Sequence, residues 1–354
     1  MPAGTRSRRR RAGLKSHKTS FSWGRHRVLV AALLVFGFGF AGVSGAVAYF
    51  LPAISAALNI TGSQTSGGKN KGGQPTPTPT TTPVATSNQP INVLLLGSDN
   101  DTKFQANDVL TQTMILVRIN PVDHSVVMFS IPRDLWVPIG DTQSYAKIDA
   151  AYADGGAAEA ITTVQNNFNV SINYWVWIGL GGLVQVINDL HQVNVVAQMP
   201  ILDDEYPYDL TGTNPYAQAR IAVLPGPQRM GGVEALEYVR SRHGDVLSDI
   251  ARSQKQQQLL LDIKASANDI GLADVPSIAS SLGTSMKTDM SITQVTSLLP
   301  LAKALGDGDV HQVVMVGDPY FSSDYYPEGP TGPDALEPHW SAIQSLVSQY
   351  FPTS

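Results

Sequence analysis

The chain has 354 residues, 43% of them hydrophobic, and it contains no cysteine. This composition supports a sizeable buried core and excludes disulfide scaffolds, thiol nucleophiles and thiolate zinc sites. Residues 1–90 carry 11 basic residues and no acidic one, whereas the remainder carries 13 basic and all 29 acidic residues, a formal charge of −16. The two portions are therefore expected to have different partners.

Residues 1–27 form a basic tail that runs directly into an uncharged apolar segment, residues 28–51. About 20 residues of helix cross a bilayer, so this segment predicts a single transmembrane helix. Arginines before it and none soon after it predict a cytoplasmic N-terminus and a C-terminal domain outside the cell membrane. A cleaved signal peptide is the alternative, but its apolar region is typically only about 7–15 residues long. Beside a membrane span, the basic tail indicates a lipid or topogenic role rather than nucleic-acid binding.

Residues 52–90 include a stretch, residues 61–90, that is rich in Gly, Ser, Thr and Pro and has no apolar periodicity. This composition predicts a flexible, partly polyproline-like linker. Such a linker would hold the folded part close to the membrane.

The folded part opens with a continuous apolar run at residues 91–97. This run predicts a strand that is buried on both faces, at the centre of an α/β sheet. Asp99 follows the strand, and ligands of open α/β sheets bind beyond the carboxyl ends of the strands. An aspartate there holds a metal, orients a hydroxyl group or caps the next loop.

Two β-branched runs, residues 113–120 and 125–131, are joined by a turn and predict a β-hairpin. The second run leads to Pro132 and Arg133. Because proline has a fixed backbone angle, Arg133 is expected to be held at the same edge of the sheet as Asp99.

Strand and helix patterns alternate after the hairpin, with Lys147 preceding the first helix. They predict helices at residues 157–168, 183–190 and 232–239 and strands at residues 174–178 and 193–199. This alternation predicts a mixed central sheet with helices on its faces. The apolar residues of these elements build the core, or some of them line a groove for a long hydrocarbon chain. The polar segment 203–218 is expected to be a loop that covers a site or merely connects two elements.

A cationic cluster interrupts the acidic portion of the chain. It consists of Arg240, Arg242, Arg252 and Lys255. Guanidinium groups stay protonated and offer a planar fork of donors, which suits phosphate and carboxylate ligands. The cluster thus predicts a dianion or pyrophosphate site, and the alternative is a set of surface arginines paired with neighbouring acids. Asp249, Arg252 and Gln256 have the spacing i, i+3 and i+7, so they are expected to share one helical face.

Residues 266–354 are expected to form a mainly helical part that packs on the same domain. The predicted elements are helices at residues 278–286, 292–305 and 338–351 and a strand at residues 311–317. The histidines show no metal-ligand spacing, and no Gly-x-Ser-x-Gly sequence is present. A hydrolase triad is therefore not supported.

Several motifs together resemble the LytR-CpsA-Psr family of bacterial cell-envelope proteins. The matching stretches are LLLGSDN (94–100), TMILVRINP (113–121), SIPRD (130–134), KIDAAY (147–152), LPGPQRMGGVEALEYVRSRH (224–243) and DIARSQKQQ (249–257). They fall within residues 91–265, in the family's order and after the expected anchor. The resemblance implies an α/β/α sandwich with a groove for lipid, and residues 91–265 would form its catalytic core.

The resemblance implies a phosphotransferase that takes a glycopolymer from a polyprenyl pyrophosphate carrier and joins it through a phosphodiester to peptidoglycan. The residues implied to bind the pyrophosphate are Arg133, Lys147, Arg240, Arg242, Arg252 and Gln256. Arg133, Asp99 and Asp249 are the implied catalytic residues. Asp99 would hold Mg²⁺ or Mn²⁺, and Asp249 would orient arginines or assist the acceptor hydroxyl. Phosphoryl transfer depends mainly on positioning and charge neutralisation, so this set of residues is chemically coherent.

The chain departs from the family pattern at the second strand. The family reads Arg-x-Asp-Thr-Met there, whereas this chain has Leu110 and Gln112 in place of the Arg and the Asp. A neutral amide is a poorer Mg²⁺ ligand than a carboxylate, so a metal shared by Asp99 and Gln112 would bind weakly unless Asp101 or Asp108 moves in as a ligand. Two alternatives stay open: a non-catalytic polyprenyl-phosphate-binding envelope or regulatory protein, and a lipid pyrophosphatase that uses water as acceptor.

Overall fold

The computed structural model describes part of the chain. The described residues are 89–98, 110–207, 217–241, 248–266, 286–291, 307–329 and 334–352, with the single residues 294, 298, 305 and 332. The predicted tail (1–27), transmembrane helix (28–51) and nearly all of the linker (52–90) lie outside them. Within the described ranges, no helix has both the length and the apolar character that a membrane crossing requires.

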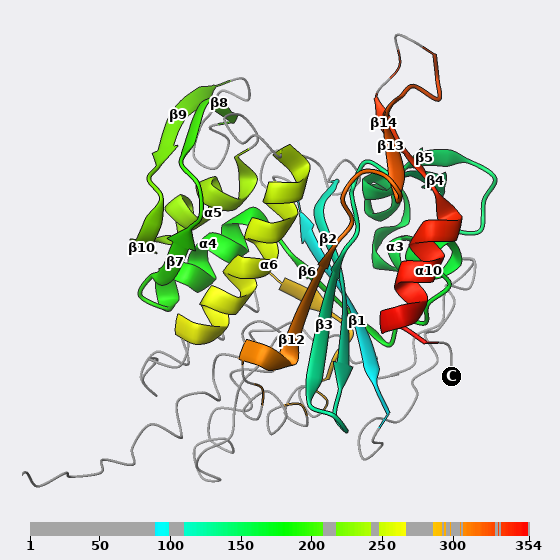
Figure 1. Cartoon of the computed structure of the whole chain (residues 1–354), viewed down its shortest axis with the longest axis horizontal. Helices are drawn as coiled ribbons and strands as arrows, with labels where there is room; N and C mark the ends of the chain where they lie inside the picture. Colours follow the sequence, from blue (N-terminus) through cyan, green and yellow to red (C-terminus); the bar gives the residue numbers. More distant parts are fainter. Residues whose placement is uncertain are drawn as a thin grey trace, which may run out of the picture.

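A six-stranded mixed sheet forms the centre of the fold, in the order β11-β6-β1-β2-β3-β12 (Figure 1). Its strands are β1 (Ile91–Ser98), β2 (Thr111–Asn120), β3 (Ser125–Ser130), β6 (Tyr174–Ile178), β11 (Met286–Thr288) and β12 (Val310–Val314). The pairs β1–β2, β2–β3 and β6–β11 are antiparallel, whereas β1–β6 and β3–β12 are parallel. The predicted central strand and the predicted hairpin are thus confirmed.

Helices cover both faces of this sheet (Figure 1). Side chains alternate along a strand, so Leu94 and Leu96 belong to one core cluster and Val93 and Leu95 to another. The first cluster packs against α3 (Ala151–Phe168) and α10 (Trp340–Tyr350). The second packs against α4 (Leu180–Asp189), α5 (Gly232–Arg240) and α6 (Ser248–Ser266). The protein is therefore a mixed α/β fold.

Among the described residues, four two-stranded sheets accompany the central one. They pair β4 (Trp136–Pro138) with β5 (Tyr145–Lys147), β7 (Val193–Ala197) with β10 (Gly226–Met230), β8 (Ile201–Pro207) with β9 (Gln218–Val223), and β13 (Phe321–Tyr325) with β14 (Ala335–Pro338). A short 3₁₀ turn, Ile148–Ala150, precedes α3, and another, Asp307–Asp309, precedes β12.

Two predictions about local structure are wrong. Residues 203–218 were expected to form a loop, but their described parts pair as β8 and β9. The sequence of β8 lacks the regular alternation of apolar and polar residues that predicts a strand. Its inward-facing residues are Ile201, Asp203 and Tyr206, of which one is acidic. Met286, expected to end a helix, lies in β11 because it pairs with Ile178 at the sheet edge. The rest of that predicted helix, and most of the helix predicted at 292–305, lie outside the described residues.

The helix predicted at residues 157–168 begins earlier, at Ala151. Its axis is interrupted at Gly155 and Gly156, which have non-helical backbone angles. Gly156 has a φ of 68°, a conformation that glycine adopts without strain. The predicted strand at 311–317 and the predicted helix at 338–351 correspond to β12 and α10 with slightly different ends.

Candidate active site

A pocket of about 400 Å³ lies beside the carboxyl end of β1, between the central sheet and helices α4, α5 and α6. Most of its wall is apolar. Six representative residues of that wall are Ile115, Val176, Leu183, Val186, Leu236 and Leu259. The pocket is thus a mostly apolar cavity at the edge of the sheet where ligands of α/β proteins bind.

The helices beside the pocket pack closely because α5 begins with a glycine. A Cβ atom on Gly232 would come within 2.1 Å of the carbonyl oxygen of Val184 in α4. The amide nitrogen of Gly232 instead donates to Asn188 Oδ1 of α4 at 2.9 Å. Close contact between α4 and α5 therefore requires glycine here, and it sets the width of this side of the pocket.

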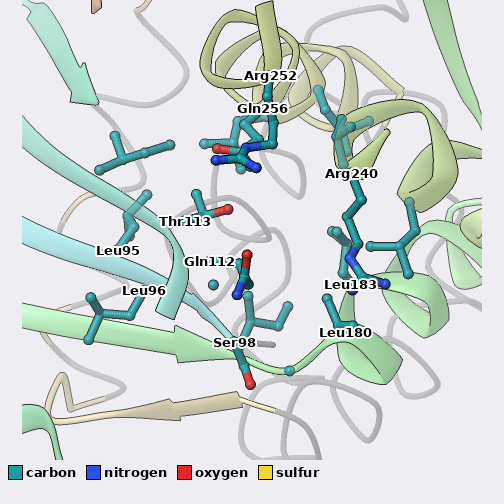
Figure 2. A pocket seen from close by; sticks show the side chains of 18 of the residues that line it. Leu95, Leu96, Ser98, Gln112, Thr113, Leu180, Leu183, Arg240, Arg252 and Gln256 are labelled. Carbon is teal, nitrogen blue, oxygen red and sulfur yellow. The ribbon is translucent and has the colours of Figure 1, made fainter. Parts of the chain in front are cut away.

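Polar side chains from distant parts of the sequence enter the same pocket. They are Ser98, Gln112, Thr113, Arg133, Asp203, Glu205, Arg240, Arg252 and Gln256. Figure 2 shows Arg252 and Gln256 reaching in from α6, opposite Gln112 and Thr113 on β2, with Arg240 extending from α5. The fold thus brings three of the arginines predicted from the sequence to one apolar cavity.

Arg133 follows β3 and is held by three neighbours. Its Nη1 donates to Gln112 Oε1, its Nε lies 3.2 Å from Asp134 Oδ2, and its Nη1 lies 4.0 Å from Asp149 Oδ2. Burial raises the pKa of Asp134, but the charges of Arg133 and Lys147 outweigh burial and leave that pKa below its ordinary value. Asp134 therefore stays ionised and fixes the guanidinium.

Lys147 does not line the pocket. Its ammonium group lies 2.8 Å from Asp134 Oδ1 and 3.8 Å from Asp334 Oδ1. Asp134 thus stands between Lys147 and Arg133, so in this arrangement Lys147 acts on the pocket only through Arg133. Its predicted direct contact with pyrophosphate stays a prediction.

Helix α6 presents Arg252 and Gln256 to the pocket from successive turns of one face. Arg252 is buried, which removes much of the water that would screen its charge. The adjacent Gln257 points the other way, and its Nε2 donates to acceptors in β3 and β12. This amide fastens the helix to the sheet and so supports the position of the two pocket residues.

Three predicted site residues cannot be placed. Asp99 and Arg242 lie outside the described residues, and the side chain of Asp249, in the first turn of α6, is not described either. Conversely, the sequence analysis missed Asp203 and Glu205 of β8, which line the pocket. The alternation of Ile201 and Asp203 was the available signal, since it places an acidic residue on the inward face of a strand.

The described residues do not fit a divalent metal at Gln112. Its side-chain oxygen accepts a hydrogen bond from Arg133, and a guanidinium at that distance repels a cation. In the part of the chain that the structure describes, no three His, Cys, Asp or Glu side chains gather into a metal site. The predicted Mg²⁺ or Mn²⁺ stays a prediction that rests on Asp99, Asp101 or Asp108, which lie outside the described residues.

A protein-family model described as the LytR_cpsA_psr family matches residues 51–329. The chain belongs to this family. The resemblance noted from its motifs is thus confirmed, and LytR-CpsA-Psr relatives can be compared with it directly.

One relative is the polyisoprenyl-teichoic acid–peptidoglycan teichoic acid transferase TagV of Bacillus subtilis, 29% identical over 265 residues, which make up 73% of this chain and 63% of TagV. Another is biofilm regulatory protein A of Streptococcus mutans, 30% identical over 241 residues, or 64% of this chain and 55% of the relative. The match thus spans less than two thirds of either LytR-CpsA-Psr relative.

Solved LytR-CpsA-Psr structures share the fold. The crystal structure of B. subtilis TagV matches with a TM-score of 0.61 and 25% identity, covering 76% of this chain and 99% of that structure. A structure of TagT bound to LIIa-WTA matches with a TM-score of 0.57 and 24% identity, covering 75% of this chain and 91% of that one. The mixed sheet with its flanking helices is therefore the family's architecture.

Proposed function

We propose that this chain is a phosphotransferase that moves a glycopolymer from a polyprenyl pyrophosphate carrier to a hydroxyl group of peptidoglycan. One observation carries the proposal: Arg133, Arg240 and Arg252 converge on a cavity whose wall is otherwise mostly apolar. A lipid pyrophosphate has the matching chemistry, since its head carries several negative charges and its tail is a hydrocarbon. The name of TagV, a teichoic acid transferase, supports the same conclusion.

The arginines would contribute electrostatic stabilisation. Guanidinium groups donate to phosphate oxygens in pairs and remain charged at any physiological pH. In a cavity with little water, each such interaction is stronger than in solution. Arg133 is already held by Gln112, Asp134 and Asp149, so little reorganisation of this side chain accompanies binding of the diphosphate.

The proposed reaction exchanges one phosphorus–oxygen bond for another. The oxygen of the acceptor hydroxyl attacks the phosphorus that carries the glycopolymer and forms a new bond to it. The bond between that phosphorus and the bridging oxygen breaks, and polyprenyl phosphate leaves with the electron pair. The hydroxyl proton passes to a base, for which Asp249 is the candidate, while the arginines neutralise the charge on the leaving phosphate. No step in this proposal uses a metal ion.

We further propose that residues 28–51 anchor the chain in the cell membrane, with the folded part outside. The apolar length of that segment supports this topology, as do the arginines that precede it, with none soon after it. A polyprenyl carrier is itself embedded in the bilayer. An anchored enzyme with the linker 52–90 would therefore meet its donor at the membrane surface.

The direct test is incubation of the purified protein with a radiolabelled, lipid-linked glycopolymer, with and without peptidoglycan. We expect label to move to peptidoglycan and polyprenyl phosphate to appear in equal amount. Arg240→Ala and Arg252→Ala should abolish transfer, whereas Arg220→Ala, which removes an exposed ion pair with Asp204, should not. Release of label into water without any transfer would identify a lipid pyrophosphatase and refute the transferase.

A second candidate is a non-catalytic protein that binds the same lipid. The hydrogen bond between Arg133 and Gln112 favours it, because Gln112 stands where the family pattern has a metal-binding carboxylate and its side-chain oxygen is engaged by a guanidinium. Binding of donor with neither transfer nor hydrolysis in the same assay would establish this role.

A further inference from the structure

Ser241, the residue that follows α5, lies between two buried residues of opposite charge. Its hydroxyl donates to Asp203 Oδ2 at 2.9 Å, and its carbonyl oxygen accepts from Lys255 Nζ at 3.4 Å. Asp203 is 1% exposed, Ser241 is 0% exposed and Lys255 is 8% exposed. Burying two charges costs free energy unless both are compensated, so this arrangement needs a reason beyond packing.

Asp203 also shapes the strand from which it comes. Its Oδ1 accepts a hydrogen bond from the backbone amide of Glu205 at 3.0 Å, and the pairing of β8 with β9 shifts register between Asp203 and Tyr206. A regular strand would place Asp203 and Tyr206 on opposite faces, because they are three residues apart. The irregularity turns both inward, as β-bulges beside binding sites do.

The re-aimed Tyr206 lies beneath Arg240. The guanidinium carbon of Arg240 is 5.7 Å from the centroid of the tyrosine ring. Strand β8 therefore supports the end of α5 at two points: Asp203 holds Ser241, and Tyr206 packs on the side chain of Arg240, the residue just before it. Arg240 in turn lines the pocket (Figure 2).

Lys255 ties the same point to α6. It lies one turn after Arg252, and its ammonium group is 5.6 Å from the centroid of the Tyr238 ring in α5. With its contact to the Ser241 carbonyl, this lysine links the two helices that supply Arg240 and Arg252. The position of Arg240 relative to Arg252 thus depends on the contacts of Ser241 with Asp203 and Lys255.

We propose that Asp203 and Lys255 are positioning residues for the lipid pyrophosphate: they clamp Ser241 and thereby hold Arg240 in the pocket at a fixed place relative to Arg252. This inference rests on the proposed function, because it assumes that the arginines bind the diphosphate. Phosphoryl-transfer sites depend on placement to within about 1 Å, so a residue that acts by holding another in place also controls ligand affinity.

The test is titration of the purified protein with geranylgeranyl pyrophosphate, followed by calorimetry. Asp203→Asn keeps one acceptor oxygen where the carboxylate uses two, and Lys255→Met keeps the length but loses the charge. Each should weaken binding about 10- to 100-fold. The matched controls are Asp204→Asn on the same strand and Lys264→Met on the same helix, which should bind as the unaltered protein does.

A double-mutant cycle separates positioning from general destabilisation. If Asp203 acts through Arg240, then Asp203→Asn introduced into the Arg240→Ala protein should weaken binding by no more than about twofold further. A full additional loss would show that Asp203 acts elsewhere and would overturn the clamp. Ser241→Ala keeps both charges and nearly the same volume, so it provides the same comparison should Asp203→Asn fail to fold.

The outcomes of these binding measurements test the clamp separately from the proposed function on which it rests. If the unaltered protein does not bind geranylgeranyl pyrophosphate, the proposed function fails and the clamp fails with it. If it binds and Arg240→Ala weakens binding, but Asp203→Asn and Lys255→Met bind normally, the function survives and the clamp is wrong.

Discussion

Replacing Gln257 with leucine measures how firmly α6 is fastened to the central sheet. The side chain is fully buried, and its Nε2 lies 2.7 Å from Ser130 Oγ and 3.1 Å from the carbonyl oxygens of both Met128 and Val313. These acceptors belong to β3 and β12. A single amide therefore joins the helix that carries Arg252 and Gln256 to two strands.

The expected cost follows from these contacts. Leucine is similar in volume to glutamine, so the substitution leaves little cavity and acts mainly by removing donors. Two hydrogens on Nε2 are lost, and each buried acceptor left unpaired costs about 1–3 kcal/mol. Leucine also removes Oε1, which is buried and has no hydrogen-bond partner within the described ranges. Losing this unpaired acceptor offsets part of the loss of unfolding free energy. We expect the free energy of unfolding to fall by about 2–4 kcal/mol.

Urea denaturation followed by circular dichroism gives this difference from the shift of the midpoint. The matched control is Gln254→Leu, an exposed position on the same helix, which should change the free energy of unfolding by less than about 0.5 kcal/mol. A loss below about 1 kcal/mol for Gln257→Leu, or one equal to that of the control, would refute the reasoning.

Three further predictions concern the pocket and its support. Gln112→Asp restores the carboxylate that the family pattern has at this position, so binding of geranylgeranyl pyrophosphate should become sensitive to Mg²⁺, measured by calorimetry with and without EDTA; indifference to Mg²⁺ would contradict this. Leu183→Asp puts a charge in the apolar wall and should weaken geranylgeranyl pyrophosphate binding at least about tenfold while sparing inorganic pyrophosphate; equal effects on both ligands would count against a lipid cavity. Because its folded pKa is lowered, Asp134 stabilises the fold above about pH 4 and loses that contribution as pH falls through the lowered pKa. Asp134→Asn should therefore show a smaller loss of unfolding free energy between neutral and acid pH in urea titrations, and unchanged acid sensitivity would argue against the ion pairs.

Local patterns predicted the central elements of the fold. The apolar run at 91–97 and the β-branched runs after residue 113 became β1, β2 and β3, and the alternation of strands with helices gave the correct class. These patterns succeed because burial on one or both faces dictates which positions must be apolar. They failed at β8, where a bulge and three acidic residues disturb the alternation.

The residue types of the site were also apparent before the structure. Permanently charged cations in an acidic chain suit an anionic ligand. The family motifs indicated which of these residues would bind the pyrophosphate. The contacts that organise those cations were not apparent. They join residues far apart in the sequence: Gln112 with Arg133, Asp203 with Ser241, and Gln257 with Ser130.

Local sequence patterns thus indicate most strands and helices, the side chains that avoid water, and the charged groups available for an anionic ligand. The packing of distant segments places Lys147 behind Asp134, turns Asp203 towards the pocket, and brings the guanidinium of Arg133 to the amide of Gln112. The physical reason is that local periodicity specifies the face on which a side chain lies. The contact partner of that side chain is specified by packing between elements, and it cannot be inferred from the neighbouring residues along the chain.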